Sequence, residues 1–224
     1  MFFVQFAEMR FRETFDLSVY FVVDPSVCNG REVESVVAAA ARGGVTMVQL
    51  RNKTDPIDVV ERQARVTQDI LADSGIPFIL NDHVELAAMI GADGVHIGQE
   101  DMSAKNARDI IGESAILGVT AYTEAHYAAI DSSVVDYVGT GPFYATKTKP
   151  DKAVLGAEGF KNLVYGVPIP VVGIGGVTAE NAASVIVAGA SGVAMMRSLS
   201  EADDVEAVAR EFVEKVRGVR YENS

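Results

Sequence analysis

Two aspartates occupy positions at which a divalent cation could be held. Asp82 follows the short apolar run 77–80, and Asp101 comes three residues after the run 94–98. The carboxyl ends of neighbouring parallel strands meet at one edge, so we expect these carboxylates about one strand spacing apart. Such a pair can bind a Mg²⁺ ion that keeps some of its waters and takes phosphate oxygens. The alternative is that each aspartate caps the helix that follows it.

Basic side chains gather at the same predicted edge. Arg51 and Lys53 are two residues apart after the second apolar run, so on an extended segment they share a face. Lys149 follows the sixth run, close to Thr146 and Thr148. The net charge of −12, from 31 acidic and 19 basic residues, argues against a nucleic-acid or anionic-membrane surface. An anionic ligand therefore requires local cations or a metal ion.

A glycine-rich segment, 173–176, follows the seventh apolar run and precedes Thr178 at an expected helix start. Glycines let backbone N–H groups approach an anion, and a helix N-terminus adds partial positive charge. The position after a seventh strand favours phosphate binding over a plain tight turn, with the segment after the eighth strand completing the site.

Other chemistries find little support. A single cysteine, Cys28, excludes a disulfide framework and a cysteine-based zinc site. His83, His96 and His126 lack metal-ligand spacing, and His96 fits a hydrogen-bonded core or rim histidine better than a catalyst. Neither a GxSxG motif nor a P-loop is present.

The elements that must position these residues alternate along the 224-residue chain, with Gly, Asp or Pro at the breaks. Helical patterns separate the apolar runs, with Asp55–Pro56 opening a helix to about Ser74, Thr123 capping another, and Asp203 with Glu206 resembling a capping box. The predicted strands are 17–23, 46–51, 77–80, 94–98, 116–120, 136–139, 170–174 and 192–196.

Eight β/α units in about 200 residues predict an α/β fold, a single-domain (β/α)₈ TIM barrel over residues 16–220. A doubly wound open sheet is the alternative. Residues 1–15 are expected to form an N-terminal arm or an extra helix. No apolar run approaches the ~20 residues of a membrane span and no secretory pattern is present, so we expect a cytoplasmic enzyme-sized domain.

Together the motifs resemble those of one family, thiamine-phosphate synthase, in order and spacing from about residue 19 to residue 198. The segments that carry the resemblance are Gln49-Leu50-Arg51-Asn52-Lys53, Asn81-Asp82, His96-Ile97-Gly98-Gln99-Glu100-Asp101, Gly118-Val119-Thr120, the stretch Tyr137 to Lys149, and Val172-Gly173-Ile174-Gly175-Gly176.

The resemblance implies a TIM-barrel transferase that joins a hydroxymethylpyrimidine diphosphate to a thiazole phosphate, with or without a carboxylate on the thiazole. Asp82 and Asp101 would ligate Mg²⁺, and Lys149, Arg51, Lys53 and Thr120 would serve catalysis. The further implied substrate-binding residues are Gln49, Leu50, Asn52, Asn81, Thr146, Lys147, Thr148, Gly176, Met196 and Arg197.

Three residues depart from the family's pattern. Thr120 stands where a serine is usual, so the hydroxyl is retained and a methyl enters the pocket. Ala145 replaces a usual proline, and Arg197 stands where serine is frequent. The Arg197 guanidinium is therefore expected to add a salt-dependent contact to the thiazole phosphate.

Three other activities remain open on the sequence. The related thiazole tautomerase shares the barrel, but the position of its expected histidine holds Tyr122 here. A phosphate-sugar isomerase would need an acid/base pair that is not evident, and a non-catalytic precursor-binding protein would release no pyrophosphate. The partners are thus small molecules, with no nucleic acid and no membrane, and a homo-oligomer is left open.

Overall fold

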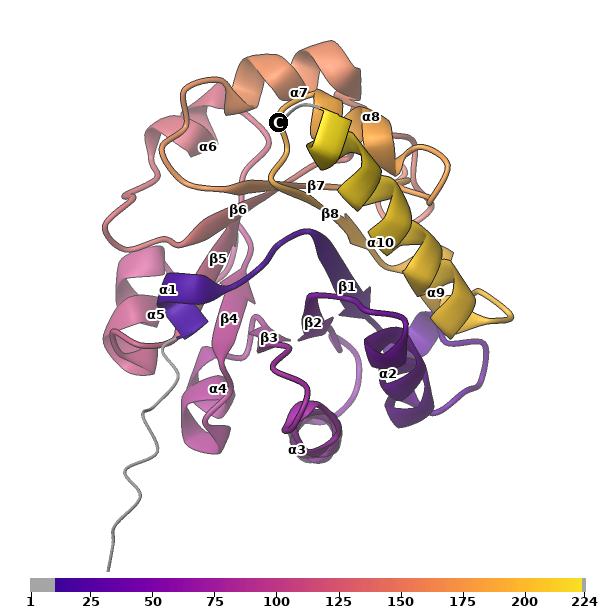
Figure 1. Cartoon of the computed structure of the whole chain (residues 1–224). Helices are drawn as coiled ribbons and strands as arrows, with labels where there is room; N and C mark the ends of the chain where they lie inside the picture. The colour runs from indigo at the N-terminus through magenta and orange to yellow at the C-terminus, as the bar shows by residue number, and fades with distance from the viewer. Residues whose placement is uncertain (1–10, 223–224) are drawn as a thin grey trace, which may run out of the picture.

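The computed structural model describes residues 11–222, in which eight parallel strands close into a barrel (Figure 1). Strand β1 (Val19–Val23) pairs with β2 (Met47–Leu50) on one side and with β8 (Gly192–Met195) on the other. This closure confirms the predicted (β/α)₈ fold and rules out the open sheet. The other strands are β3 (Phe78–Asn81), β4 (Gly94–Ile97), β5 (Ile116–Thr120), β6 (Tyr137–Thr140) and β7 (Val171–Ile174).

Helices surround the barrel and cover its outer face (Figure 1). The crossover helices are α2 (Val33–Arg42), α3 (Ile57–Leu71), α4 (Val84–Ile90), α5 (Ala104–Ile111), α6 (Glu124–Ala128), α7 (Gly156–Val164) and α8 (Ala182–Val187). Short elements α1 (Phe11–Thr14), η1 (Pro25–Val27) and α9 (Arg197–Ser200) and the long α10 (Val205–Glu222) complete the chain. Within the described residues, no helix combines the length and apolar character needed to cross a membrane.

The predicted strand bounds agree with the observed ones within two residues, whereas two helix caps were wrong. Helix α3 spans Ile57 to Leu71 and has no side-chain cap at its start. The predicted cap, Asp55, instead accepts a hydrogen bond from Asn52 Nδ2 at 2.8 Å. Asp204 rather than Asp203 accepts from the Ala207 N–H at the start of α10. The predicted Thr123 cap is confirmed by its bond from the His126 N–H.

Alternate strand residues face the barrel interior and the helices, so the strands are buried on both sides. Large buried side chains contribute about 1.5–3 kcal/mol each when fully removed from water. The inner cluster is Leu17, Tyr20, Met47, Ile79, Ile116, Tyr137, Val172 and Ala194, with Phe15 and Ile174 packed against it. A larger outer cluster, including Phe21, Val48 and Leu80, lies between the strands and the helices.

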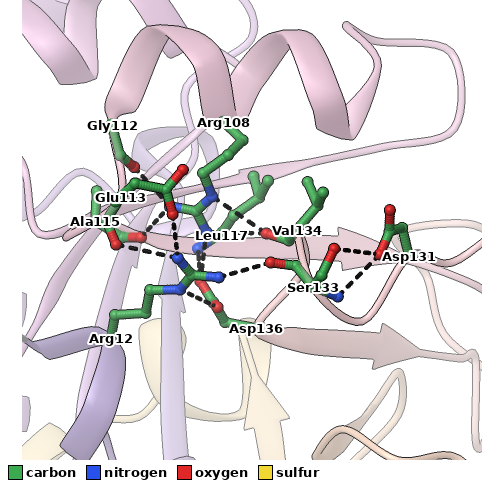
Figure 2. A network of polar contacts seen from close by, with 10 residues as sticks. All are labelled: Arg12, Arg108, Gly112, Glu113, Ala115, Leu117, Asp131, Ser133, Val134 and Asp136. Atoms are coloured by element: carbon green, nitrogen blue, oxygen red, sulfur yellow. Dashed lines mark hydrogen bonds and ion pairs between the residues drawn. The ribbon is translucent and has the colours of Figure 1, made fainter.

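The segment before β1 is tied to the amino-terminal end of the barrel, as Figure 2 shows. Arg12 of α1 bonds Asp136 through Nε at 2.7 Å and Glu113 through Nη1 at 2.8 Å. Asp136 also pairs with buried Arg108 at 2.7 Å, and Phe15 contacts the Tyr137 ring. Residues 11–15 thus close this end with an extra helical turn, while residues 1–10 of the predicted arm lie outside the described part of the chain.

Candidate active site

A pocket of about 430 Å³ opens at the carboxyl-terminal ends of the strands, opposite the end closed by Phe15. Because the barrel is closed and parallel, every β-to-α loop starts at this end. The pocket wall includes eleven of the residues that the sequence implicated. They are Gln49, Arg51, Asn81, Thr120, Thr146, Lys147, Thr148, Lys149, Gly176, Met196 and Arg197.

The remaining implicated residues lie around the pocket rather than in its wall. The Leu50 side chain packs in the outer core, away from the pocket. Asn52 is buried and organises its own loop, since its side chain contacts Asp55 and Gln63 and the N–H groups of residues 54 and 55. Lys53 lies beside the carboxylates, with its Nζ 2.6 Å from Asp82 Oδ2.

Asp82 and Asp101 lie near enough to shift each other's pKa, so the structure brings together the two carboxylates from separate loops. Burial raises the pKa of Asp82, and Asp101 raises it further against the opposing effect of Lys53. Burial alone would raise the pKa of Asp101. A hydrogen bond from the Gly98 N–H and the nearby Lys53 outweigh this effect and lower the pKa below its usual range. Like charges at this distance repel, and a cation relieves that repulsion.

Neither aspartate caps the helix that follows it, so the capping interpretation is wrong. Helix α4 has no side-chain cap, and α5 is capped by Ser103. Asp82 instead holds a left-handed backbone with φ of 64°, a conformation found mostly at functional or turn positions for a non-glycine residue. No cluster of three or more His, Cys, Asp or Glu side chains that could hold a metal ion exists among residues 11–222, so a cation at this carboxylate pair would need further ligands from water or substrate.

Arg51 is held in place by Asp24, which follows β1 and is buried. Asp24 also accepts bonds from the Ser26 N–H and hydroxyl, which fix the carboxylate at the start of η1. Sequence reasoning missed Asp24. The rule that located the other site residues, inspection of the positions just after each strand, points to it when applied to the first strand.

Lys149 lines the pocket wall from the loop between β6 and α7, and its residue remains exposed to solvent. Burial lowers the pKa of its ammonium group, and the nearby Lys152, Arg51 and Lys53 lower it further, while Asp82 opposes them. Lys152, which the sequence reasoning also missed, lines the same pocket with its Nζ 3.6 Å from the centre of the Tyr122 ring. A pocket in an acidic chain thus concentrates positive charge, and such a cluster favours an anionic ligand.

The glycine segment after β7 curves tightly around the opposite side of the pocket. Gly176 has φ of +65°, and a Cβ there would lie 2.5 Å from the Ala145 oxygen, so a side chain does not fit. The Asn181 side chain accepts from the Thr178 N–H and donates to the Gly176 oxygen. Thr178 therefore does not start the helix as predicted, because α8 begins only at Ala182.

Two buried donors in this pocket wall have no hydrogen-bond partner within the described chain. They are Asn81 Nδ2 and Arg197 Nε. Buried polar atoms are nearly always paired in proteins, so an unpaired donor at a pocket wall indicates a ligand acceptor. The Arg197 Nη1 atom is already paired with Glu201, which also lines the pocket.

His96 is hydrogen-bonded through both ring nitrogens, to the Tyr137 hydroxyl at 3.0 Å and the Thr120 hydroxyl at 2.9 Å. Burial is the main cause that lowers its pKa to about 4, with Lys149 contributing. The ring is therefore neutral near pH 7. This confirms the expectation of a satisfied histidine.

The amino-acid sequence and the fold of this chain are both similar to those of proteins with one and the same activity. The sequence model of the family described as thiamine monophosphate synthase matches residues 19–199. A thiamine-phosphate synthase of Bacillus velezensis is 45% identical over 90% of this chain and 91% of its own. One from Xanthobacter autotrophicus is 43% identical over 92% and 98%. A solved thiamine phosphate pyrophosphorylase from Pyrococcus furiosus aligns with a TM-score of 0.83 at 29% identity, covering 94% of this chain and 98% of that one.

Proposed function

The chain belongs to the thiamine monophosphate synthase family and is a transferase with that activity, and we propose which of its residues perform the reaction. The substrates are a hydroxymethylpyrimidine diphosphate and a thiazole phosphate. Their products are thiamine phosphate and pyrophosphate, with CO₂ when the thiazole carries a carboxylate.

The observation that carries this assignment is a single pocket with two anion-binding sides. One side holds Arg51 and Lys149, with Lys53 and the paired carboxylates beside them, and it suits the diphosphate. The other side is the close-packed backbone at Gly176 with Arg197, and it suits the smaller phosphate. Two anions held this way place the reacting carbon and nitrogen between them.

The chemistry requires no protein nucleophile. The aminopyrimidine ring donates electrons to its methylene group, so the methylene C–O bond breaks and pyrophosphate leaves with the electron pair. The thiazole nitrogen then uses its lone pair to form the new C–N bond to the methylene carbon. Arg51, Lys53 and Lys149 stabilise the charge on the departing pyrophosphate, which is where a fixed cation lowers the barrier most.

Asp82 and Asp101 would fit a Mg²⁺ site, because two adjacent carboxylates that leave most coordination positions open match an ion shared with phosphate oxygens. When bound there, Mg²⁺ would neutralise part of the diphosphate charge. Asn81, the last residue of β3, would donate through its unpaired Nδ2 to a diphosphate oxygen.

The remaining polar residues position the two rings. Gln49 and Thr120 would contact the pyrimidine, and the threonine keeps the hydroxyl that the family's usual serine supplies. Thr146, Thr148 and the backbone at Gly176 and Met196 would hold the thiazole phosphate. The Ala145 atom that lies next to Gly176 is its backbone oxygen, which a proline at this position would also supply.

The direct test is to incubate the purified protein with both precursors, with and without Mg²⁺, and to measure thiamine phosphate and pyrophosphate. We expect both products in equal amounts, and only with Mg²⁺. Binding of both precursors without pyrophosphate release would identify a precursor-binding protein instead. Conversion of a thiazole tautomer in the absence of the pyrimidine would identify a tautomerase.

Arg197→Ser is expected to raise the KM for the thiazole phosphate about tenfold at low ionic strength. The lost guanidinium carries the unpaired buried Nε, and charge-assisted bonds to phosphate are worth about 1.5–3 kcal/mol. The difference should shrink as salt is added, because the contact is partly exposed. Steady-state kinetics at two salt concentrations measure it. The matched control is Arg210→Ser, which removes an arginine from another i,i+4 pair with glutamate outside the pocket. We expect an unchanged KM in this control. An unchanged KM in Arg197→Ser would show that the guanidinium does not contact the thiazole phosphate.

A further inference from the structure

A continuous chain of hydrogen bonds crosses the barrel interior beneath the pocket. Gln49 Nε2 lies 2.6 Å from the Tyr20 hydroxyl, which lies 2.7 Å from the Tyr137 hydroxyl. From Tyr137 the chain continues to His96 Nδ1 at 3.0 Å and from His96 Nε2 to the Thr120 hydroxyl at 2.9 Å. Its two ends, Gln49 and Thr120, both line the pocket, whereas the central Tyr137 does not.

The barrel is shaped to admit these rings. Gly118 lies against the Tyr137 ring so closely that a Cβ there would come within 2.4 Å of the ring's hydroxyl oxygen. A Cβ on Gly139 would approach His96 Cε1 to 3.1 Å. Tyr20 and Tyr137 are fully buried and their rings meet edge to face at 5.7 Å. The two tyrosine hydroxyls at the centre of the chain are therefore packed inside the barrel, where each has few alternative hydrogen-bond partners.

The direction of every bond follows from proton counting. An amide nitrogen can only donate, so Tyr20 accepts from Gln49 and its own proton must go to Tyr137. Tyr137 then donates to His96 Nδ1. The neutral imidazole has one N–H, which must be at Nε2 and donates to Thr120. The other tautomer leaves the buried Tyr20 hydroxyl proton without an acceptor, at a cost that buried polar groups rarely carry.

The consequence appears at the two ends of the chain. Thr120 Oγ1 already accepts from His96, so its own proton is directed into the pocket. Gln49 donates through Nε2 to Tyr20, so the Oε1 of the same amide is the atom left to act as an acceptor for a ligand in the pocket. The pocket floor thus offers one acceptor and one donor, and their order along the floor is set by Tyr20, Tyr137 and His96, of which Tyr137 lies outside the pocket wall.

We propose that His96, Tyr137 and Tyr20 are positioning residues that fix this polarity, and that it selects a 4-aminopyrimidine over its 4-oxo counterpart. The proposal rests on the proposed function, in which Gln49 and Thr120 contact the pyrimidine. The amino group donates to Gln49 Oε1, and the adjacent ring nitrogen accepts from Thr120. A 4-oxo ring presents an acceptor and an N–H in the reverse order, so both of its contacts would be mismatched.

The test variant is Tyr137→Phe, which interrupts the chain at a residue outside the pocket wall. Without the Tyr137 hydroxyl, His96 can change tautomer and Thr120 can turn either way. We expect kcat/KM for the amino substrate to fall about tenfold, and the preference for amino over oxo diphosphate to fall about tenfold relative to wild type. The two substrates' intrinsic difference in reactivity is the same for both enzymes and cancels in this comparison.

The control is Tyr127→Phe, which removes another tyrosine hydroxyl bonded to a threonine, Thr140, outside the pocket. We expect its amino/oxo preference to equal that of the wild type. If Tyr137→Phe loses rate but keeps the full preference, or if Tyr127→Phe loses the preference equally, the residues are structural only and the proposal is wrong.

The tautomer gives a second, activity-independent readout. In protein labelled with ¹⁵N-histidine, with the signal assigned by its loss in His96→Gln, we expect His96 to carry its proton on Nε2 in the wild type and to populate both tautomers in Tyr137→Phe. A wild-type proton on Nδ1 would overturn the assigned direction. Absence of thiamine phosphate in the wild type, with the Nε2 proton present, would overturn the proposed function but leave the hydrogen-bond chain intact.

Discussion

Lys149→Ala is expected to lower kcat about 10³-fold while the protein remains folded. Lys149 is a pocket-lining cation of the diphosphate side, and removing one fixed donor from a developing anion costs about 10²–10³ in kcat. Its place in the pocket wall among Lys152, Arg51 and Lys53 puts the expected loss toward the upper end of that range. Single-turnover kinetics with saturating substrates measure the effect separately from binding.

The pH dependence supplies an independent check on Lys149. Its pKa is lowered from the usual 10.5, first by burial and then by neighbouring cations. The protonated form is the one that stabilises pyrophosphate, so kcat/KM, which reports the free enzyme, should fall as pH rises through that lowered pKa. A bound diphosphate raises the pKa again, so the corresponding fall in kcat should occur at higher pH.

Lys161→Ala is the control for this experiment, because it removes an exposed lysine on α7 outside the pocket. Its kcat and pH profile should match the wild type. Unchanged turnover in Lys149→Ala with saturating substrates would remove Lys149 from the leaving-group site. A loss confined to KM would show that Lys149 binds the diphosphate equally in the ground and transition states.

Most of the rim could be predicted from the sequence because a parallel barrel places every strand end on one face. That rule located Arg51, Lys149 and Thr120 from strand bounds that were wrong by no more than two residues. The rule was less reliable for residues within a strand, because the side chain of such a residue can point either into the barrel or toward the helices. Leu50 carries a side chain directed to the outer core, since alternate strand residues point to opposite sides.

Two features were beyond sequence reasoning for different reasons. The Thr178 helix start was wrong because the Asn181 side chain takes up the Thr178 N–H, a local competition that composition does not reveal. The interior hydrogen-bond chain depends on barrel closure. Tyr20 and Tyr137 are 117 residues apart, and their hydroxyls meet only because β1 and β6 face each other across the closed barrel.

Asp82→Asn is expected to lower kcat/KM about 10²-fold and to raise the Mg²⁺ concentration required for half-maximal rate. Asparagine is the substitution that isolates charge, because Asp82 has φ of 64° and asparagine is among the few residues that accept this conformation readily. The variant has a second effect, because it also removes the ion pair to Lys53, whose Nζ lies 2.6 Å from the carboxylate. We expect loss of the metal site to be the larger of the two effects.

Asp101→Asn separates those two effects, since among the described residues the ion pair to Lys53 involves Asp82. The amide oxygen that this substitution introduces can still accept from the Gly98 N–H, so the loop is retained and only the charge is lost. If the carboxylates bind one ion together, the double variant should cost little more than either single variant, because groups that act as a unit are not additive. Titration of Mn²⁺ in the presence of the pyrimidine diphosphate, followed by calorimetry, should show weaker metal binding in all three variants. Wild-type affinity in all of them, or fully multiplicative losses in rate, would mean that the carboxylates act through Lys53 and the diphosphate and that no shared ion lies between them.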